Sequence, residues 1–125
     1  MKKCIIALFA FLLAASVAFA RDSINGPTNI IVTGYIIDNH CADMQTEDTL
    51  QSFVRLHTKE CALMPTCAAS GYSIYTSDGE LLKFDRNSSI RVQQFLEQPN
   101  SKLQVEVIAE RSGDELKLVS IRNQW

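Results

Sequence analysis

The chain after residue 28 contains several short runs rich in β-branched and aromatic residues, which are typical of β-strands. In one of them, alternate residues from Leu103 to Ala109 are apolar and would share one face of a sheet. Gly34 interrupts the first run and indicates a bulge or a sharp bend at that position. The pattern predicts five strands, at 29–38, 72–76, 80–85, 103–110 and 115–122.

Two other stretches have the apolar spacing of a helix. The first is 47–64, with Thr46 as its expected N-cap, Pro65 as its expected end, and a turn of small residues predicted at 66–71. One face of this predicted helix would carry Leu50, Phe53, Val54, His57 and Cys61.

A second helix is predicted at 87–98, with Asn87 or Ser88 as the N-cap. If the inserted helix is set aside, the predicted order is β-β-β-α-β-β, which is the order of the five-stranded OB-fold barrel. The Gly34 kink suits a first strand that is shared between the two halves of such a barrel. We therefore expect an all-β or α+β chain folded as an OB-like barrel, with a helical Cys/His insertion between strands 1 and 2. An open α+β sheet with its helices on one face is the alternative.

Residues 1–20 have the layout of a secretory signal peptide. Two lysines begin the segment, an apolar stretch follows, and the small residues Ala18 and Ala20 match a cleavage pattern. An uncleaved membrane anchor is the alternative, although the apolar stretch is at the short edge of the spanning range. We predict cleavage, a mobile N-terminal lead at 21–28 and a single domain at 29–125. This predicts a periplasmic or secreted protein with no stable membrane insertion.

The composition is that of an ordinary globular protein, with 46% hydrophobic and 21% charged residues, which argues against intrinsic disorder. The 12 basic and 14 acidic residues give a formal net charge of −2, and loss of the signal peptide would remove two lysines and make it more negative. Nucleic-acid binding by counterion release needs clustered basic residues, whereas here they are scattered. Nucleic acid is therefore excluded as a partner, and the identity of any protein or small-molecule partner stays open.

Cleavage would also remove Cys4 and leave three cysteines, an odd number that cannot all pair within one chain. These three cysteines, both histidines and Met64 lie within the window 40–67. Such a concentration of soft donors predicts a site for zinc or copper. His57 and Cys61, four positions apart on the predicted helix, would point in the same direction. The predicted ligands are His57, Cys61 and Cys67, completed by Cys41, His40 or Met64.

Two alternatives to a metal site remain. A disulfide from Cys41 to Cys61 or Cys67 would join the insertion to the barrel, contribute about 2–4 kcal/mol and leave one buried thiol. A Cys/His nucleophile made of Cys61 and His57 would need a third group to orient the imidazole, and the sequence shows none. The sequence therefore favours a non-enzymatic role over catalysis.

The cysteine region resembles that of a group of small exported bacterial proteins of uncharacterised function. The motif that carries the resemblance is Asp38-Asn-His-Cys41, then His57-Thr-Lys-Glu-Cys-Ala-Leu-Met-Pro-Thr-Cys67 and Ala-Ala-Ser-Gly-Tyr72. Many members of the group have Gly after the first cysteine, where this chain has Ala42. The resemblance covers nearly all of the mature chain. It implies an OB-like barrel, a bacterial periplasmic or secreted setting and an important cysteine region, and it supplies no settled activity.

The function expected from the sequence is therefore binding of a soft transition metal, zinc or copper, through a Cys/His/Met cluster. The competing expectation is a disulfide-stabilised, non-enzymatic module that presents its barrel surface to a protein or a small ligand.

Overall fold

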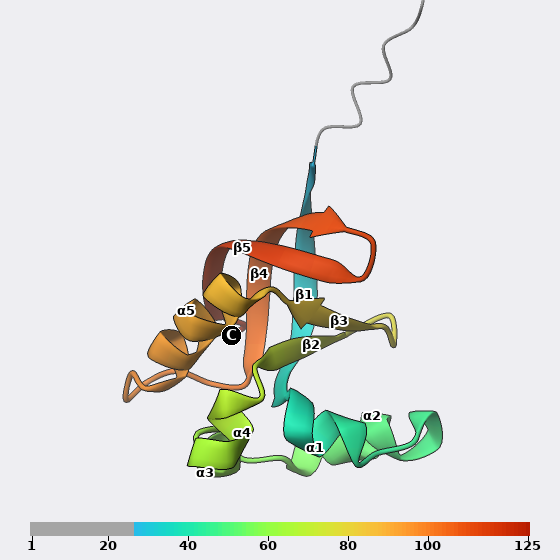
Figure 1. Cartoon of the computed structure of the whole chain (residues 1–125), viewed down its shortest axis with the longest axis vertical. Coiled ribbons are helices and arrows are strands. Elements are labelled where there is room, and N and C mark those ends of the chain that lie inside the picture. The colour runs from blue at the N-terminus through green and yellow to red at the C-terminus, as the bar shows by residue number, and fades with distance from the viewer. Residues whose placement is uncertain (1–26) are drawn as a thin grey trace, which may run out of the picture.

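The computed structural model describes residues 27–125, which form a closed barrel of five strands in the order β1-β2-β3-β5-β4 (Figure 1). The predicted signal peptide at 1–20 and most of the predicted lead at 21–28 lie outside the described residues, and Thr28 of that lead already belongs to the first strand. The strands are β1 (Thr28–Asp38), β2 (Tyr72–Thr76), β3 (Leu81–Phe84), β4 (Gln104–Ser112) and β5 (Glu115–Asn123). The predicted five-stranded OB-like barrel is confirmed, with strand limits that differ from the predicted ones by at most two residues.

The first strand is long enough to pair with two neighbours. Its first part is antiparallel to β4 and its last part is antiparallel to β2, and both pairings include Gly34. A side chain at Gly34 would overlap the backbone carbonyl of Tyr75 on β2, so glycine is required where the strand passes from one partner to the other. A short parallel pairing of β3 with β5 closes the barrel.

The barrel interior is filled by apolar side chains that alternate along each strand. On β4 the predicted inward face is confirmed, because Val105, Val107 and Ala109 are fully buried and Leu103 is nearly so. This alternation gives the barrel one apolar core, formed by the inward-facing side chains of its strands.

The helices of the insertion differ from the single helix that the spacing predicts at 47–64. The structure has four short helices between β1 and β2, namely α1 (Asn39–Asp43), α2 (Glu47–Leu56), α3 (Lys59–Ala62) and α4 (Pro65–Ala69). The chain leaves the helical conformation at His57, with φ −62° and ψ 138°, because Thr58 begins a new helix by accepting a hydrogen bond from the Cys61 N–H. Pro65 does not merely end a helix. It occupies the first turn of α4, where a missing N–H costs nothing, so the predicted turn at 66–71 is largely helical.

The remaining helix, α5 (Arg86–Leu96), follows β3 as predicted. Its N-cap is Asp85, whose carboxylate accepts from the Ser88 N–H, and not Asn87 or Ser88. Its buried face includes Val92 and Leu96, which pack into the barrel core. None of the helices in 27–125 has the length and apolar character that crossing a membrane would need.

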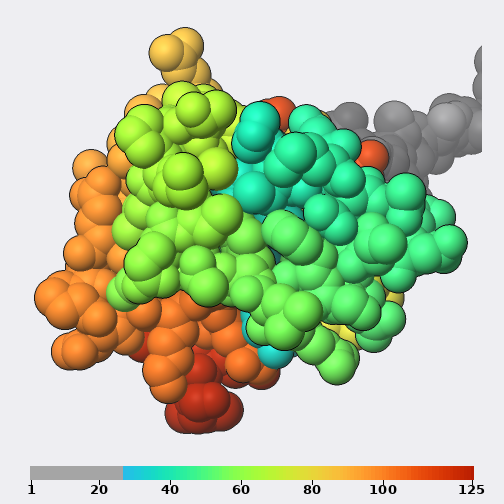
Figure 2. Space-filling view, turned by 90° about the horizontal axis from the view of Figure 1, so that it is seen from below, coloured from blue at the N-terminus to red at the C-terminus, as the bar shows by residue number. Residues whose placement is uncertain are grey.

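The insertion α1–α4 lies at one end of the barrel (Figure 1) and, in the view from below, its green and teal segments cover most of that end (Figure 2). It has a small apolar core of its own, which includes Ile37, Leu50 and Val54. Lys59 joins it to the barrel, because its ammonium donates to the carbonyls of Gln98 and Ser101 beyond the end of α5. This arrangement holds the cysteine-bearing segments against the end of a rigid barrel.

Candidate metal centre

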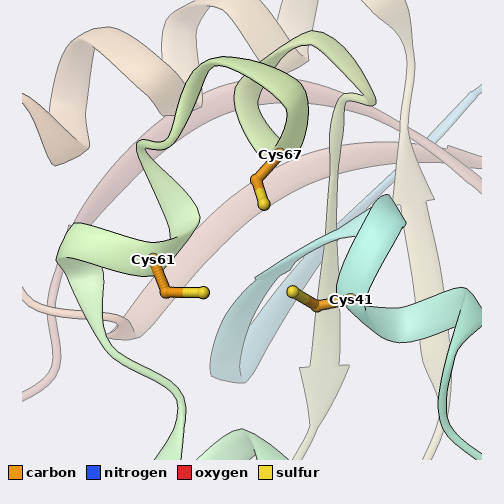
Figure 3. A group of neighbouring side chains, drawn as sticks. All are labelled: Cys41, Cys61 and Cys67. Atoms are coloured by element: carbon orange, nitrogen blue, oxygen red, sulfur yellow. The ribbon is translucent and has the colours of Figure 1, made fainter.

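Three cysteines from three different helices meet inside the insertion. Cys41 lies on α1, Cys61 on α3 and Cys67 on α4, and their Sγ atoms all lie within 4.8 Å of one another (Figure 3). Figure 3 shows the three side chains pointing toward a common centre. The convergence that the sequence predicts for its soft side chains is therefore present for the sulfurs.

Cys41 is positioned by the end of β1. Asp38 is the last residue of that strand and the N-cap of α1, and its Oδ2 accepts a hydrogen bond from the Cys41 N–H at 2.8 Å. The side chain of Asp38 is fully buried, so the cap is protected from water. The barrel strand thus determines where the first sulfur lies.

Cys67 is held beside Cys41 by contacts between α1 and the end of α4. The Asn39 N–H donates to the Gly71 carbonyl at 2.9 Å, and the His40 N–H donates to Ser70 Oγ at 2.9 Å. Ser70 Oγ in turn donates to the Cys67 carbonyl at 2.6 Å. These bonds connect the two helices that supply the buried sulfurs.

Cys61 is positioned by a hydrogen bond from the barrel to its helix. The Tyr72 hydroxyl, buried at the start of β2, donates to the carbonyl of Ala62 at 2.8 Å, and burial raises the pKa of that hydroxyl to about 12. Thr58 caps the same short helix through the Cys61 N–H. A helix of four residues has little stability alone, so these contacts and Lys59 hold the third sulfur in place.

The three thiols differ in exposure. Cys41 and Cys67 are each 5% exposed, whereas Cys61 is half-buried. Burial, together with the neighbouring Asp38 carboxylate, raises the pKa of the Cys41 and Cys67 thiols above the usual range. A thiol in such surroundings keeps its proton unless a cation compensates the thiolate charge.

A buried Asp–His contact lies beside the sulfurs. His57 Nε2 is 3.1 Å from Asp38 Oδ1, and the two side chains are 1% and 0% exposed. The distance is that of an ion pair, yet the ring N–H is not aligned with the carboxylate, so Oδ1 and both ring nitrogens lack hydrogen-bond partners within the described residues. Burial would raise the pKa of Asp38, but the His57 ring and the hydrogen bond from Cys41 outweigh it, so the pKa is lowered.

The structure places four of the six predicted ligands in two donor sets and leaves the other two at the surface. Cys41, Cys61 and Cys67 form one set of converging donors, and His57 joins Asp38 and Cys41 in a second set. The predicted helical pairing of His57 with Cys61 is wrong, because His57 is extended and lies between α2 and α3, whereas Cys61 is on α3.

The other two predicted ligands, His40 and Met64, lie at the surface. The side chain of Met64 is 55% exposed, and His40 is exposed on α1 and belongs to neither donor set. Two loop acids near the cysteines, Asp38 and Asp43, look alike in the sequence. Only Asp38 is buried at the site, and the one local signal for it is its N-cap position, three residues before Cys41.

The two alternatives to a metal site find less support in this geometry. The cysteines at 41, 61 and 67 are free, so neither of the predicted disulfides is formed. The predicted nucleophile needs His57 beside Cys61 as its base, whereas His57 contacts Asp38 and shares its donor set with Cys41. The arrangement is that of donors able to bind a cation.

No protein-family model, curated protein or solved structure matches this chain at a significant level. The interpretation of the site therefore depends on its own geometry: the Cys/His/Asp cluster in the insertion could hold a metal ion.

Proposed function

We propose that this protein is an exported, non-enzymatic metal-binding protein that holds a soft transition metal, Zn²⁺ or Cu⁺, through the sulfurs of Cys41, Cys61 and Cys67. The observation that carries the proposal is the meeting of three free sulfurs from three helices within 4.8 Å. A ligand set made of thiolates favours soft or borderline cations over Mg²⁺ and Ca²⁺, which prefer oxygen donors.

The surroundings of the sulfurs support a metal site over three thiols that bind no ligand. The helices that carry Cys41 and Cys61 are hydrogen-bonded to β1, β2 and the segment after α5. The end of the helix that carries Cys67 is hydrogen-bonded to α1. Metal sites need donors that are oriented before the ion arrives. Cys61 is only half-buried, so the cluster is less enclosed at this sulfur than at the other two.

An exported location adds a chemical reason for the ion. Closely spaced thiols in an oxidising compartment tend to form disulfides, whereas thiolates bound to a metal are protected. With three sulfurs, pairing of any two would also leave one unpaired. We therefore expect the bound metal to maintain the reduced state of the cluster.

The test is metal binding by the purified protein, stripped of metal and kept reduced. We expect at least one Zn²⁺ or Cu⁺ per chain by elemental analysis. Replacing Cys61 with Ser should weaken binding by more than the roughly 10–100-fold that changes outside the ligand shell cost. If the reduced protein retains no ion after equilibration with either metal, the proposal is wrong.

Matched controls come from the surface donors of the same insertion. His40→Gln and Met64→Leu replace potential ligands that lie at the surface in the structure. Both variants should bind metal as the unaltered protein does. A loss of affinity in Met64→Leu equal to that in Cys61→Ser would instead show that the ligand set includes the thioether.

A further inference from the structure

We propose that the protein has a second metal site, made of Asp38, Cys41 and His57, which shares the Cys41 sulfur with the three-cysteine site. The proposal rests on the metal-binding function proposed above, because Cys41 serves both sites. One carboxylate oxygen, one ring nitrogen and the Cys41 sulfur all lie within 4.8 Å of one another.

The first support is the unmet bonding capacity of buried atoms. Asp38 Oδ1 and both ring nitrogens of His57 have no hydrogen-bond partner within the described residues, although both side chains are almost completely buried. A buried polar atom without a partner is energetically costly, so such atoms are rare unless something binds them. A cation between the nitrogen, the oxygen and the sulfur would satisfy the carboxylate and one nitrogen together.

The second support is the geometry of the Asp–His contact. His57 Nε2 and Asp38 Oδ1 are 3.1 Å apart, but the ring does not direct its N–H at the carboxylate. Two ligands about 2.0–2.2 Å from a tetrahedral Zn²⁺ lie roughly 3.3–3.6 Å from each other, with both aimed at the ion. The observed distance is close to that separation, and the missing hydrogen bond fits two ligands of one ion better than a hydrogen-bonded pair.

The third support is charge. Three thiolates and one carboxylate in a buried cluster carry four negative charges when His57 is neutral, and burial of uncompensated charge is costly. One divalent ion compensates half of this charge, whereas two divalent ions compensate all of it. The mixed nitrogen, oxygen and sulfur donors of the second set also favour Zn²⁺, which accepts all three, over Cu⁺, which prefers sulfur.

The experiment is a count of Zn²⁺ in the reduced protein after equilibration with a slight excess of zinc and removal of the unbound ion. We expect two ions per chain. A count of one would overturn the second site and leave the proposed function intact. A count of zero would overturn both.

Two substitutions locate the second ion. Asp38→Asn keeps an N-cap residue for α1, and His57→Gln keeps a polar side chain, and each should lower the count from two to one. The retained ion shows that the variant is folded around the three sulfurs. Asp43→Asn and His40→Gln change exposed residues of the same types on α1 and should retain both ions. Two ions in Asp38→Asn and His57→Gln would overturn the assignment of these ligands.

Sharing of the Cys41 sulfur by two ions can be detected by ¹¹³Cd NMR spectroscopy. With ¹¹³Cd²⁺ in place of zinc, two resonances should appear, and each should be split by coupling to the other through the bridging Cys41 sulfur. Loss of one resonance in His57→Gln should remove the splitting of the other. Two unsplit resonances in the unaltered protein would show two separate sites and overturn the bridge.

Discussion

The barrel and the insertion are stabilised in different ways. The barrel has a continuous ladder of paired strands around a core of fully buried apolar residues, including Ile36, Ile74 and Val107. The insertion has four helices of 4 to 10 residues, a smaller apolar core and buried ionisable groups at its centre. Short helices and buried polar atoms contribute little stability by themselves. The difference indicates that the barrel can fold on its apolar core, whereas the insertion depends on the barrel and, in our proposal, on a bound ion.

The largest expected effect comes from breaking the barrel. Gly34→Ala would place a methyl group against the Tyr75 carbonyl where β1 passes from β4 to β2. Backbone cannot move aside as a flexible side chain can, so we expect a loss of about 3 kcal/mol or more in the free energy of unfolding. Urea denaturation measures this, and Gly113→Ala, where no atom lies near the added carbon, is the comparison. Because Gly113 has φ +62°, that variant should cost only about 1 kcal/mol.

The second largest effect is expected from zinc binding, which should stabilise the insertion more than the barrel. Zinc at about 100 times its dissociation constant stabilises a binding region by about 2.7 kcal/mol, or roughly 100-fold in local opening. We expect amide hydrogen exchange in 39–71 to slow by about this factor on loading, while protection in β4 and β5 changes little. An equal gain in protection in both regions would show that they open as one unit. The barrel and the insertion would then not be stabilised in different ways.

The junction between the regions should show a smaller effect. Tyr72→Phe keeps the buried ring and removes the hydroxyl that donates to Ala62, so a buried carbonyl loses its partner. We expect a loss of about 1–3 kcal/mol in stability and weaker zinc binding, since α3 carries Cys61. The control is Tyr75→Phe, because Tyr75 is only partly buried and has no hydroxyl bond to the cysteine helices in the described chain. Unchanged zinc affinity in Tyr72→Phe would show that this bond does not position the sulfur.

The smallest effect is expected at the Lys59 contact. Lys59→Met removes an ammonium that donates to carbonyls after α5 but keeps most of the apolar chain. These bonds are partly exposed, so we expect a loss of about 1 kcal/mol, seen in hydrogen exchange of α3 before it is seen in the barrel. Lys102→Met, at an exposed position, should change neither. An equal loss of stability in both variants would show that the Lys59 contact does not hold the insertion to the barrel.

Prediction from the sequence succeeded where the signal was a repeated pattern. The alternation from Leu103 to Ala109 identified β4 and its inward face, and the order of elements identified the barrel. It failed where one hydrogen bond decided the conformation. The spacing at 47–64 is helical throughout, but the Thr58 cap begins a new helix and turns His57 away from Cys61.

The candidate site was partly predictable for the same reason. Three cysteines in one short window indicated a site, and their sulfurs do converge. Residue type alone does not show that Asp38 rather than Asp43, or His57 rather than His40, is buried, because the members of each pair have the same chemistry. Burial separates them: Asp38 and His57 are enclosed between the insertion and the barrel, while Asp43 and His40 remain exposed.

The amino-acid sequence alone determined the strands, their order and the set of soft side chains, because apolar alternation and residue identity are local properties of the chain. Tertiary structure alone decided which of those side chains share a centre. That choice depends on where four short helices end and on which hydrogen bonds hold them to the barrel. Such contacts join separate elements of the chain, as the bond from Tyr72 to Ala62 and the contact of Asp38 with His57 show.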